Sequence, residues 1–243
     1  MPELTPLSGK RAVVVGGGSG IGAGCAIALA NAGATVVVGG RRREPLDDLA
    51  GSHERISGAT VDIADHTSVD AFFSKIESQG PIDVIINSAG VNVAKRTLAD
   101  VSHSDWDRMM QINATGAFHV IKRATPAMVE RGDGLIITVS SIAGLRSLEL
   151  AGAGYCASKF ATSSLSTYAG LEYAETGVRF TAIYPGEVET PLLDQRPEPV
   201  SAERRAKMLQ PEDVGAAVVM IASLPPRAHV PDLTIKPTVQ RFA

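Results

Sequence analysis

The sequence predicts an α/β protein built on one doubly wound parallel sheet of about seven strands, with helices on both faces. Short β-branched stretches alternate with longer helical stretches along almost the whole chain. The strand stretches are nearly continuously apolar, which is typical of parallel strands covered on both sides. A glycine-rich turn follows the first strand directly. Together these observations indicate right-handed βαβ units in an open sheet.

The elements follow from these patterns in chain order. Runs of β-branched residues between turn residues predict strands, expected at Ala12–Val15, Thr35–Val38, Thr60–Val61, Val84–Ile86, Leu135–Val139, Val178–Ile183 and Leu233–Ile235. Apolar residues at helical spacing, such as Val69, Phe72, Phe73 and Ile76, predict helices between the strands. The helices are expected at Ile21–Asn31, about Glu44–Ala50, His66–Ser78, about Ser104–Arg131 and about Tyr155–Thr176.

Length and composition favour one globular domain over residues 1–243. Hydrophobic residues make up 44% and charged residues 20% of the chain, and no linker or low-complexity tract divides it. The segment from about 187 to 210 differs, because it is rich in proline and charge. A long irregular excursion in a compact domain is usually a lid or binding loop, so we expect this segment to be the substrate loop.

Several classes of protein and site are excluded by the composition. A net charge of −3 argues against nucleic acid as a partner. No apolar run reaches the roughly 18 residues of a membrane span, and Met1–Leu4 lacks the start of a signal peptide. Two cysteines do not make a disulfide framework, so a cytoplasmic location is expected. The five histidines lack metal-ligand spacing, so no metal site is expected.

The turn Gly16–Gly22 opens the first helix directly after the first strand. Glycines allow a tight turn and a close approach of the backbone to a ligand. The positive end of the helix favours a pyrophosphate group. The turn therefore indicates a dinucleotide site, although this segment alone also fits a flexible turn.

Arginines rather than an acidic residue follow the second strand. An acid there would accept a hydrogen bond from the ribose 2′-hydroxyl of NAD, whereas arginine accommodates the 2′-phosphate of NADP. Arg41, Arg42 and Arg43 also fit a solvated helix start, but cations at that end oppose the helix dipole. The pattern therefore predicts NADP(H).

Tyr155 and Lys159 lie four residues apart on a predicted helix and hence on one face. The ammonium is expected to lower the pKa of the phenol from about 10 toward the range that acid–base catalysis needs. Ser140 and Ser141 end the fifth strand, at the sheet edge where such folds place their sites. A tyrosine and lysine at this spacing also occur by chance in many helices, so the pair alone does not establish catalysis.

In chain order, six motifs resemble the short-chain dehydrogenase/reductase family, and the match covers almost the whole chain. They are Gly16–Gly22, Asn87–Gly90, Ile112–Asn113, Ser140–Ser141, Tyr155–Lys159 and Pro185–Gly186. The resemblance implies a Rossmann-type fold and a catalytic set of Asn113, Ser141, Tyr155 and Lys159. Ser141 is preferred over Ser140 because it matches the family's Ser-x-x-Gly phase with Gly144.

The resemblance also implies the role of each residue. Ser141 and Tyr155 would bind the substrate oxygen, Tyr155 would transfer the proton, and Lys159 would tune Tyr155 and bind the nicotinamide ribose. Asn113 resembles the family residue that interrupts a long helix and supports a water relay to the lysine, while a plain helix-boundary asparagine stays an open alternative. The implied cofactor contacts are Gly16, Gly18, Ser19, Gly20, Ile21, Gly22, Arg41, Arg42, Asp62, Ile63, Asn87, Gly90, Tyr155, Lys159, Pro185, Gly186 and Thr190.

Two departures from the family pattern affect the supporting frame, since Val15 replaces a threonine and Ser88 an asparagine. They are expected to alter stability more than chemistry. By the same analogy the substrate pocket would include residues near Arg96 and Arg146. An arginine there could orient a carboxylate, or either could equally be exposed.

The expected function is that of an NADP-dependent carbonyl reductase or alcohol dehydrogenase. Hydride would pass between NADP(H) and a ketone or secondary alcohol, or a 3-oxo or 3-hydroxy compound, in a homodimer or homotetramer. The ending Leu233–Thr238 looks more like dehydrogenases of 3-hydroxy acids than like acyl-thioester reductases. A non-catalytic NADPH-binding regulator on the same fold is the alternative, and the intact catalytic set argues against it.

Overall fold

A computed structural model describes residues 5–241. Met1–Leu4, on which the expectation about a signal peptide depends, lie outside the described residues. Within the described range all paired strands run parallel, in one sheet of order β3-β2-β1-β4-β5-β6-β7. The strands are β1 Arg11–Val15, β2 Thr35–Gly40, β3 Ile56–Thr60, β4 Val84–Asn87, β5 Gly134–Val139, β6 Val178–Pro185 and β7 Asp232–Ile235. The prediction of a doubly wound parallel sheet is confirmed.

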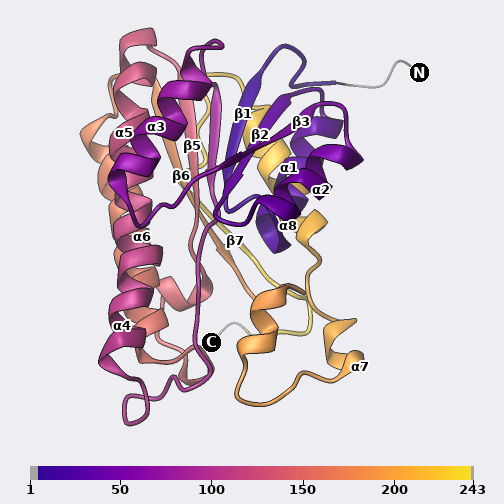
Figure 1. The fold of residues 1–243 in the computed structure, drawn as a ribbon, viewed down its shortest axis with the longest axis vertical. Coiled ribbons are helices and arrows are strands. Elements are labelled where there is room, and N and C mark those ends of the chain that lie inside the picture. The colour runs from indigo at the N-terminus through magenta and orange to yellow at the C-terminus, as the bar shows by residue number, and fades with distance from the viewer. Residues whose placement is uncertain (1–4, 242–243) are drawn as a thin grey trace.

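Helices cover both faces of the sheet (Figure 1). One side carries α1 (Gly20–Asn31), α2 (Arg43–Ser52) and α8 (Pro211–Ala222). The other carries α3 (His66–Glu77), α4 (His103–Met109), α5 (Gly116–Arg131) and α6 (Ala153–Glu172). Successive strand residues supply the two cores in turn: Val14 packs with α1 and α8, and Val13 and Val15 pack with α3 and α5. Continuously apolar strands are therefore buried on both faces.

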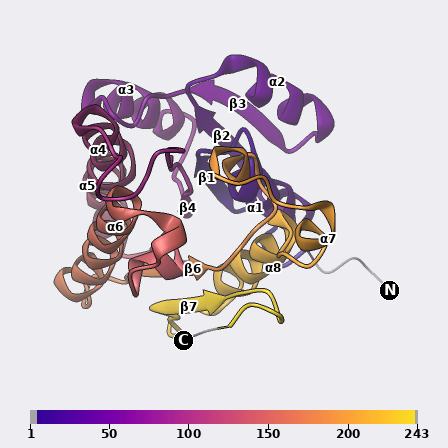
Figure 2. The same cartoon turned by 90° about the horizontal axis from the view of Figure 1, so that it is seen from below.

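The carboxyl ends of the strands lie at one edge of the sheet, seen end-on in Figure 2. The order of the strands reverses direction between β1 and β4, because β2 and β3 extend to one side and β5 to β7 to the other. In open α/β sheets the crevice outside this reversal is where ligands bind. The fold thus brings the glycine turn after β1 and the segments after β4, β5 and β6 to one place.

The bounds of two elements differ clearly from the sequence expectations, and one helix was not expected. The third strand is Ile56–Thr60 rather than Thr60–Val61, because Ser57 and Gly58 pair with β2 without looking like strand residues. The sixth helix ends at Glu172, four residues before the expected end. Helix α8 was not predicted at all, although it packs closely along α1.

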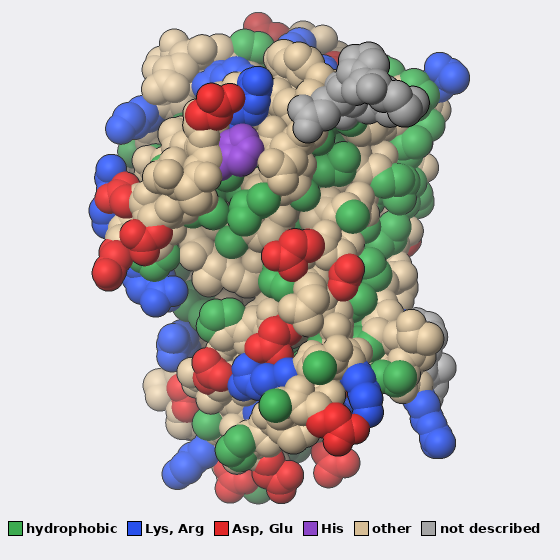
Figure 3. Space-filling view, turned by 90° about the vertical axis from the view of Figure 1, so that its right-hand side faces the viewer, with side chains coloured by type: hydrophobic (Ala, Val, Ile, Leu, Met, Phe, Trp, Pro, Cys, Tyr) green, Lys and Arg blue, Asp and Glu red, His purple; other side chains and the backbone are tan. Residues whose placement is uncertain are grey.

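The segment 187–210 contains two short helical turns, Pro191–Gln195 and α7 (Ala202–Arg205). Acidic and basic side chains alternate over the lower part of the face shown in Figure 3. Ion pairs tie this segment together: Arg205 contacts Glu189 at 2.7 Å and Asp194 at 3.1 Å. Ion pairs thus link parts of the segment to one another, while its buried Val188 joins the apolar core of α1 and α8.

Within residues 5–241, no helix combines the length and hydropathy needed to cross a membrane. The same range contains no group of three or more His, Cys, Asp or Glu side chains placed to hold a metal ion.

Helices α1 and α8 approach so closely that a single methyl group is expected to separate them. A Cβ at Gly24 would lie 2.6 Å from the carbonyl oxygen of Pro211. We predict that Gly24→Ala lowers the free energy of unfolding by about 1–3 kcal/mol, as overpacked cores do. Gly51→Ala is the matched control, because a Cβ there meets nothing within 4 Å and alanine favours the helix by up to about 1 kcal/mol. Urea unfolding measures both, and equal stabilities of the two variants would contradict the prediction.

Candidate active site

Two adjoining cavities open at the carboxyl edge of the sheet. The larger measures about 630 Å³ and runs from the glycine turn to Tyr155 and Lys159. The smaller measures about 170 Å³ and lies between Tyr155 and the segment after β6. Residues that line both are Ile21, Asn92, Ser140, Tyr155, Thr190 and Leu192. Tyr155 therefore stands where the two cavities meet.

The glycine turn forms one end of the larger cavity. Gly16 and Gly20 have φ angles of 79° and 53°, which favour glycine. A Cβ at Gly16 would lie 2.5 Å from the backbone nitrogen of Ala89, so the turn packs directly on the segment after β4. The cap residue of α1, Ser19, makes no side-chain hydrogen bond to the helix. The first amides of α1 are thus left to face the cavity, as a phosphate-binding helix start requires.

The replacements at Val15 and Ser88 leave this junction connected. The backbone nitrogen of Ser88 donates to the carbonyl of Val15 at 2.9 Å, and Val15 is buried in the core. Backbone hydrogen bonding therefore joins the two segments without the threonine hydroxyl.

Arg41 and Arg42 line the cavity beyond the end of β2. Both are exposed, and neither forms an ion pair with any residue in the described range 5–241. Arg43 differs, because its Nε contacts Asp47 at 2.8 Å within α2. Two unpaired guanidinium groups at this rim are suited to a phosphate.

Most of the expected cofactor residues line the larger cavity, and four do not. Gly16, Gly18, Ser19, Gly20, Ile21, Arg41, Arg42, Asp62, Ile63, Gly90, Tyr155, Lys159 and Thr190 line it. Pro185 and Gly186 line the smaller cavity instead. Gly22 and Asn87 line neither: a Cβ at Gly22 would lie 2.1 Å from the Gly16 carbonyl oxygen, and Asn87 is buried with an unpaired Oδ1. Gly22 and Asn87 thus shape the frame behind the cavity wall.

Tyr155 and Lys159 share one face of α6 as expected, with Lys159 Nζ 5.7 Å from the centre of the tyrosine ring. Lys159 is buried, and its Nζ donates to the Val139 carbonyl at 2.9 Å. Burial lowers the pKa of Lys159 from 10.5 to about 8, because water solvates the ammonium less well there.

The expectation that the pKa of Tyr155 is lowered is not met. Burial raises the pKa of Tyr155 to about 12, and it outweighs the hydrogen bond with the Ser141 side chain and the positive charge of Arg96, which both act downward. Part of the ring is exposed to the cavity, but the loss of solvation of the phenolate dominates. Tyr155 is therefore a neutral phenol near pH 7, the form that can donate a proton.

The two serines after β5 have different surroundings. Ser140 is buried, and its hydroxyl bonds the Lys159 carbonyl and Ser163. Ser141 lines the smaller cavity and hydrogen-bonds Tyr155. A Cβ at Gly144 would lie 2.5 Å from the Ser140 hydroxyl, so the Ser-x-x-Gly spacing reflects tight packing. This geometry favours Ser141 as the serine that reaches a substrate.

Asn113 lies in a π-helical turn, Met110–Thr115, between α4 and α5. Its side chain accepts from the Val91 amide at 2.8 Å and donates to the Val91 carbonyl and the Ser158 hydroxyl, each at 2.9 Å. A π-turn inside a long helix often marks a functional site. The contacts show that Asn113 fixes the segment after β4 against α6.

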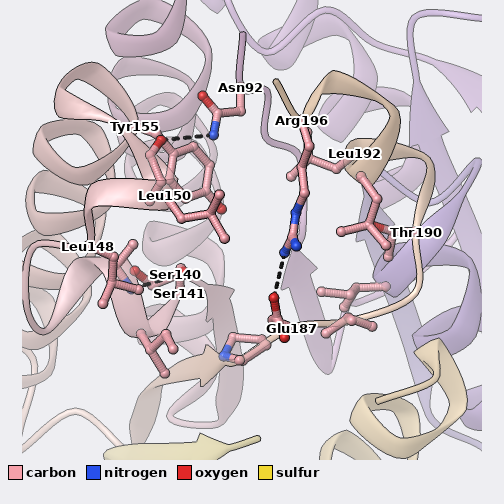
Figure 4. A pocket seen from close by; sticks show the side chains of 18 of the residues that line it. Asn92, Ser140, Ser141, Leu148, Leu150, Tyr155, Glu187, Thr190, Leu192 and Arg196 are labelled. Atoms are coloured by element: carbon pink, nitrogen blue, oxygen red, sulfur yellow. Dashed lines mark hydrogen bonds and ion pairs between the residues drawn. The ribbon is translucent and has the colours of Figure 1, made fainter. Parts of the chain in front are cut away.

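The smaller cavity has aliphatic and charged walls (Figure 4). Leu148 and Leu150 lie on the side of Tyr155, and Leu192 lies opposite. Arg196 reaches into the space between and contacts Glu187 at 2.9 Å. Such a lining suits a small molecule with an apolar body and a polar group.

Sequence reasoning missed Asn92, which lines both cavities and donates from Nδ2 to the Ala151 carbonyl at 3.1 Å. Its place just after the Asn87–Gly90 motif was the available signal. Arg108 and Gln195 also line the larger cavity. No pattern in the sequence distinguishes them from other polar residues on helices and loops.

Comparison with known proteins identifies relatives of the whole chain. The family model for short chain dehydrogenases matches residues 10–200. An uncharacterised oxidoreductase of Staphylococcus aureus (strain MW2) is 32% identical, over 96% of this chain and the full length of that protein.

Solved structures agree with this relationship. A closed form of serine dehydrogenase complexed with NADP+ superposes with a TM-score of 0.89 at 27% identity, covering 96% of this chain and 97% of that one. A 3-ketoacyl-(acyl-carrier-protein) reductase from Brucella melitensis complexed with NADH has a TM-score of 0.87 at 26% identity, covering 95% and 98%. Both of these relatives were solved with a nicotinamide dinucleotide bound.

The buried ammonium of Lys159 is expected to cost stability. A pKa of about 8 instead of 10.5 corresponds to about 3 kcal/mol at neutral pH. The cost disappears as pH rises from about 8 to 10.5, because the unfolded chain then binds more protons than the folded one. We predict that Lys159→Met has a larger free energy of unfolding than the wild type at pH 7. The gain is the roughly 3 kcal/mol of relieved desolvation minus about 1 kcal/mol for the lost hydrogen bond.

Urea unfolding of both proteins at pH 7 and pH 9.5 tests this prediction. The difference in the free energy of unfolding between the two proteins should narrow at the higher pH. Groups that titrate alike in both proteins cancel in that difference. A difference that stays constant or widens would contradict it.

Proposed function

Because the chain belongs to the short-chain dehydrogenase family and its cofactor is a nicotinamide dinucleotide, we propose that it is an NADP(H)-dependent carbonyl reductase or alcohol dehydrogenase. Its substrates would be ketones and secondary alcohols, or 3-oxo and 3-hydroxy compounds. The observation that carries the proposal is the junction of the two cavities. There Tyr155, Ser141 and Lys159 lie together between a dinucleotide-sized groove and a small mixed cavity.

Each residue has a chemical part in this proposal. When bound, the dinucleotide supplies hydride to the carbonyl carbon in reduction and accepts it in oxidation. Ser141 and Tyr155 donate hydrogen bonds to the carbonyl oxygen, and Tyr155 gives it a proton as it becomes an alcohol. Lys159 would hold the ribose beside the nicotinamide, and its ammonium would stabilise the phenolate of Tyr155 that remains after the proton has left. Asn113 positions the segment after β4, since both ends of its amide bond Val91.

The neutral phenol is the form of Tyr155 that reduction uses near pH 7. With its pKa raised to about 12, Tyr155 holds the proton that reduction consumes. Oxidation needs the phenolate, which is scarce at neutral pH.

The proposed substrate class is taken from the names of structural relatives. Two structural relatives are named for serine and 3-ketoacyl compounds, which carry a hydroxyl or oxo group at the third carbon. We extend that class to this chain because the small cavity beside Tyr155 offers both aliphatic and charged walls.

We also propose a homo-oligomer. Helices α5 and α6 expose apolar side chains, with exposed fractions of 42% for Phe118, 61% for Tyr168 and 74% for Leu171. Large exposed apolar side chains on these two neighbouring helices are what a subunit contact would cover.

Tyr155→Phe tests the chemistry. The variant keeps the ring but has no proton to donate, so turnover of NADPH with a panel of ketones, aldehydes and 3-oxo acids should fall by about 10²–10⁴-fold. Binding of NADPH, followed by its fluorescence, should change little. Wild-type binding without turnover in either direction would instead indicate the NADPH-binding regulator.

Arg41→Gln and Arg42→Gln test the cofactor preference. Each exposed guanidinium that binds the 2′-phosphate should contribute a roughly tenfold tighter dissociation constant for NADPH and almost nothing for NADH. Arg43→Gln is the matched control, because that arginine is already paired with Asp47. Calorimetric titration of both cofactors measures the effect, and equal losses for NADH and NADPH would refute the assignment.

A further inference from the structure

Arg96 is a buried cation that no acidic residue neutralises. It lies on the loop after β4, retains only 6% of its surface exposed and lines the smaller cavity together with Tyr155. Among the described residues, 5–241, no carboxylate lies within ion-pairing distance of it. The guanidinium donates to the backbone carbonyls of Leu150 and Gln195, and its Nε has no partner. Charged side chains are seldom buried without an opposite charge, because desolvation is costly.

The packing fixes Arg96 in this place. Its carbonyl accepts from the Ala153 amide at 3.1 Å. Its side-chain stem lies against Gly152, where an added Cβ would stand 2.5 Å from the Cβ of Arg96. Gly152 has a φ of 83°, which also favours glycine. The guanidinium is thus held at the cavity wall before any ligand arrives.

Other charges in the cavity leave a positive excess. Arg196 and Glu187 are the other charged residues that line it. The Glu187 carboxylate is already bound by both Arg196 and Arg204, each at 2.9 Å. Burial and the nearby charge of Arg196 both lower the pKa of Arg96, so the two guanidinium groups repel each other. An anion between them would relieve that repulsion.

A purely structural clamp explains these facts less well. Two backbone carbonyls need only neutral donors, which a glutamine could provide without a buried charge. The charge instead suits a carboxylate: the two terminal nitrogens each carry a second N–H besides the one given to a backbone carbonyl, and a carboxylate binds guanidinium through two parallel hydrogen bonds.

We infer that Arg96 binds the carboxylate of the substrate, and that the protein acts on short oxo acids or hydroxy acids. A cavity of about 170 Å³ is close to the roughly 150 Å³ that accommodates benzene, so the part of the acid that fills it spans few carbons. Arg96 binds the carboxylate end of this substrate while Tyr155 donates its proton to the carbonyl oxygen. The inference rests on the proposed function, since it assigns a role to a residue beside the reacting group.

Turnover of a matched pair of substrates tests the inference. With NADPH, 3-oxobutanoate should have a kcat/KM at least about tenfold above that of its methyl ester, as one charge-assisted bidentate contact implies. Arg96→Met should raise KM for the acid by about the same factor and change kcat/KM for the ester less than about threefold. Lys95→Met is the matched control, because the neighbouring Lys95 is exposed and lines neither cavity. It should leave both substrates unchanged.

Equal use of acid and ester by the wild type would overturn the inference. Equal losses with both substrates in Arg96→Met would also overturn it and indicate a clamp that shapes the cavity.

Binding to the wild-type protein gives a second test that needs neither turnover nor a folded variant. Calorimetry in saturating NADP+ should show that butyrate binds and that butyramide does not. Binding of butyrate without any turnover of carbonyl substrates would support the carboxylate site and reject the proposed reaction. Equal affinity for both ligands, or for neither, would reject the site, whatever the outcome for turnover.

Discussion

The hydrogen bond from Lys159 to the Val139 carbonyl joins helix α6 to the end of strand β5, and the arrangement of the site depends on it. It is a buried contact between an ammonium and a backbone oxygen, in a place where α6 crosses the carboxyl edge of the sheet. Tyr155 lies one helical turn before Lys159, and Ser141 lies two residues after Val139. The same contact therefore sets the spacing between the phenol and the serine hydroxyl. Ser140 reinforces it by bonding the Lys159 carbonyl and Ser163.

This arrangement has an electrostatic consequence. The lysine and the tyrosine are both partly or wholly withdrawn from water, and burial shifts the pKa of each toward its neutral form. At neutral pH Tyr155 is therefore an uncharged proton donor, while Lys159, with a pKa of about 8, still carries its positive charge. Further positive charge lies in both cavities, with Arg41 and Arg42 at the rim of the larger one and Arg96 and Arg196 in the smaller one. A dinucleotide phosphate and an acidic substrate would thus be drawn to opposite ends.

The sequence predicted what local patterns and motif order encode. Apolar strands, the glycine turn and the Tyr155–Lys159 spacing led to the correct sheet and to residues that do meet in one cleft. It failed where tertiary packing decides: α8 packs on α1 through Gly24 and Gly215, residues that make a helix look weak when read alone. The pKa of Tyr155 was predicted in the wrong direction, because spacing on a helix shows the lysine but not the depth of burial.

The burial of Arg96 could not be predicted from the sequence. Its burial depends on Gly152 and on the carbonyls of Leu150 and Gln195, which lie 54 and 99 residues further along the chain. No local pattern reports on contacts of that kind, so an exposed and a buried arginine looked the same. The proposed catalytic groups lie on α6 and at the end of β5, which are anchored in the core. Arg96 and Arg196 lie on loops at the same edge, where substitutions disturb the core least. Under the proposed function, substrate choice could therefore change through these loops while the proton-transfer group stays fixed, so the family motif would report on the reaction and the loop arginines on the substrate.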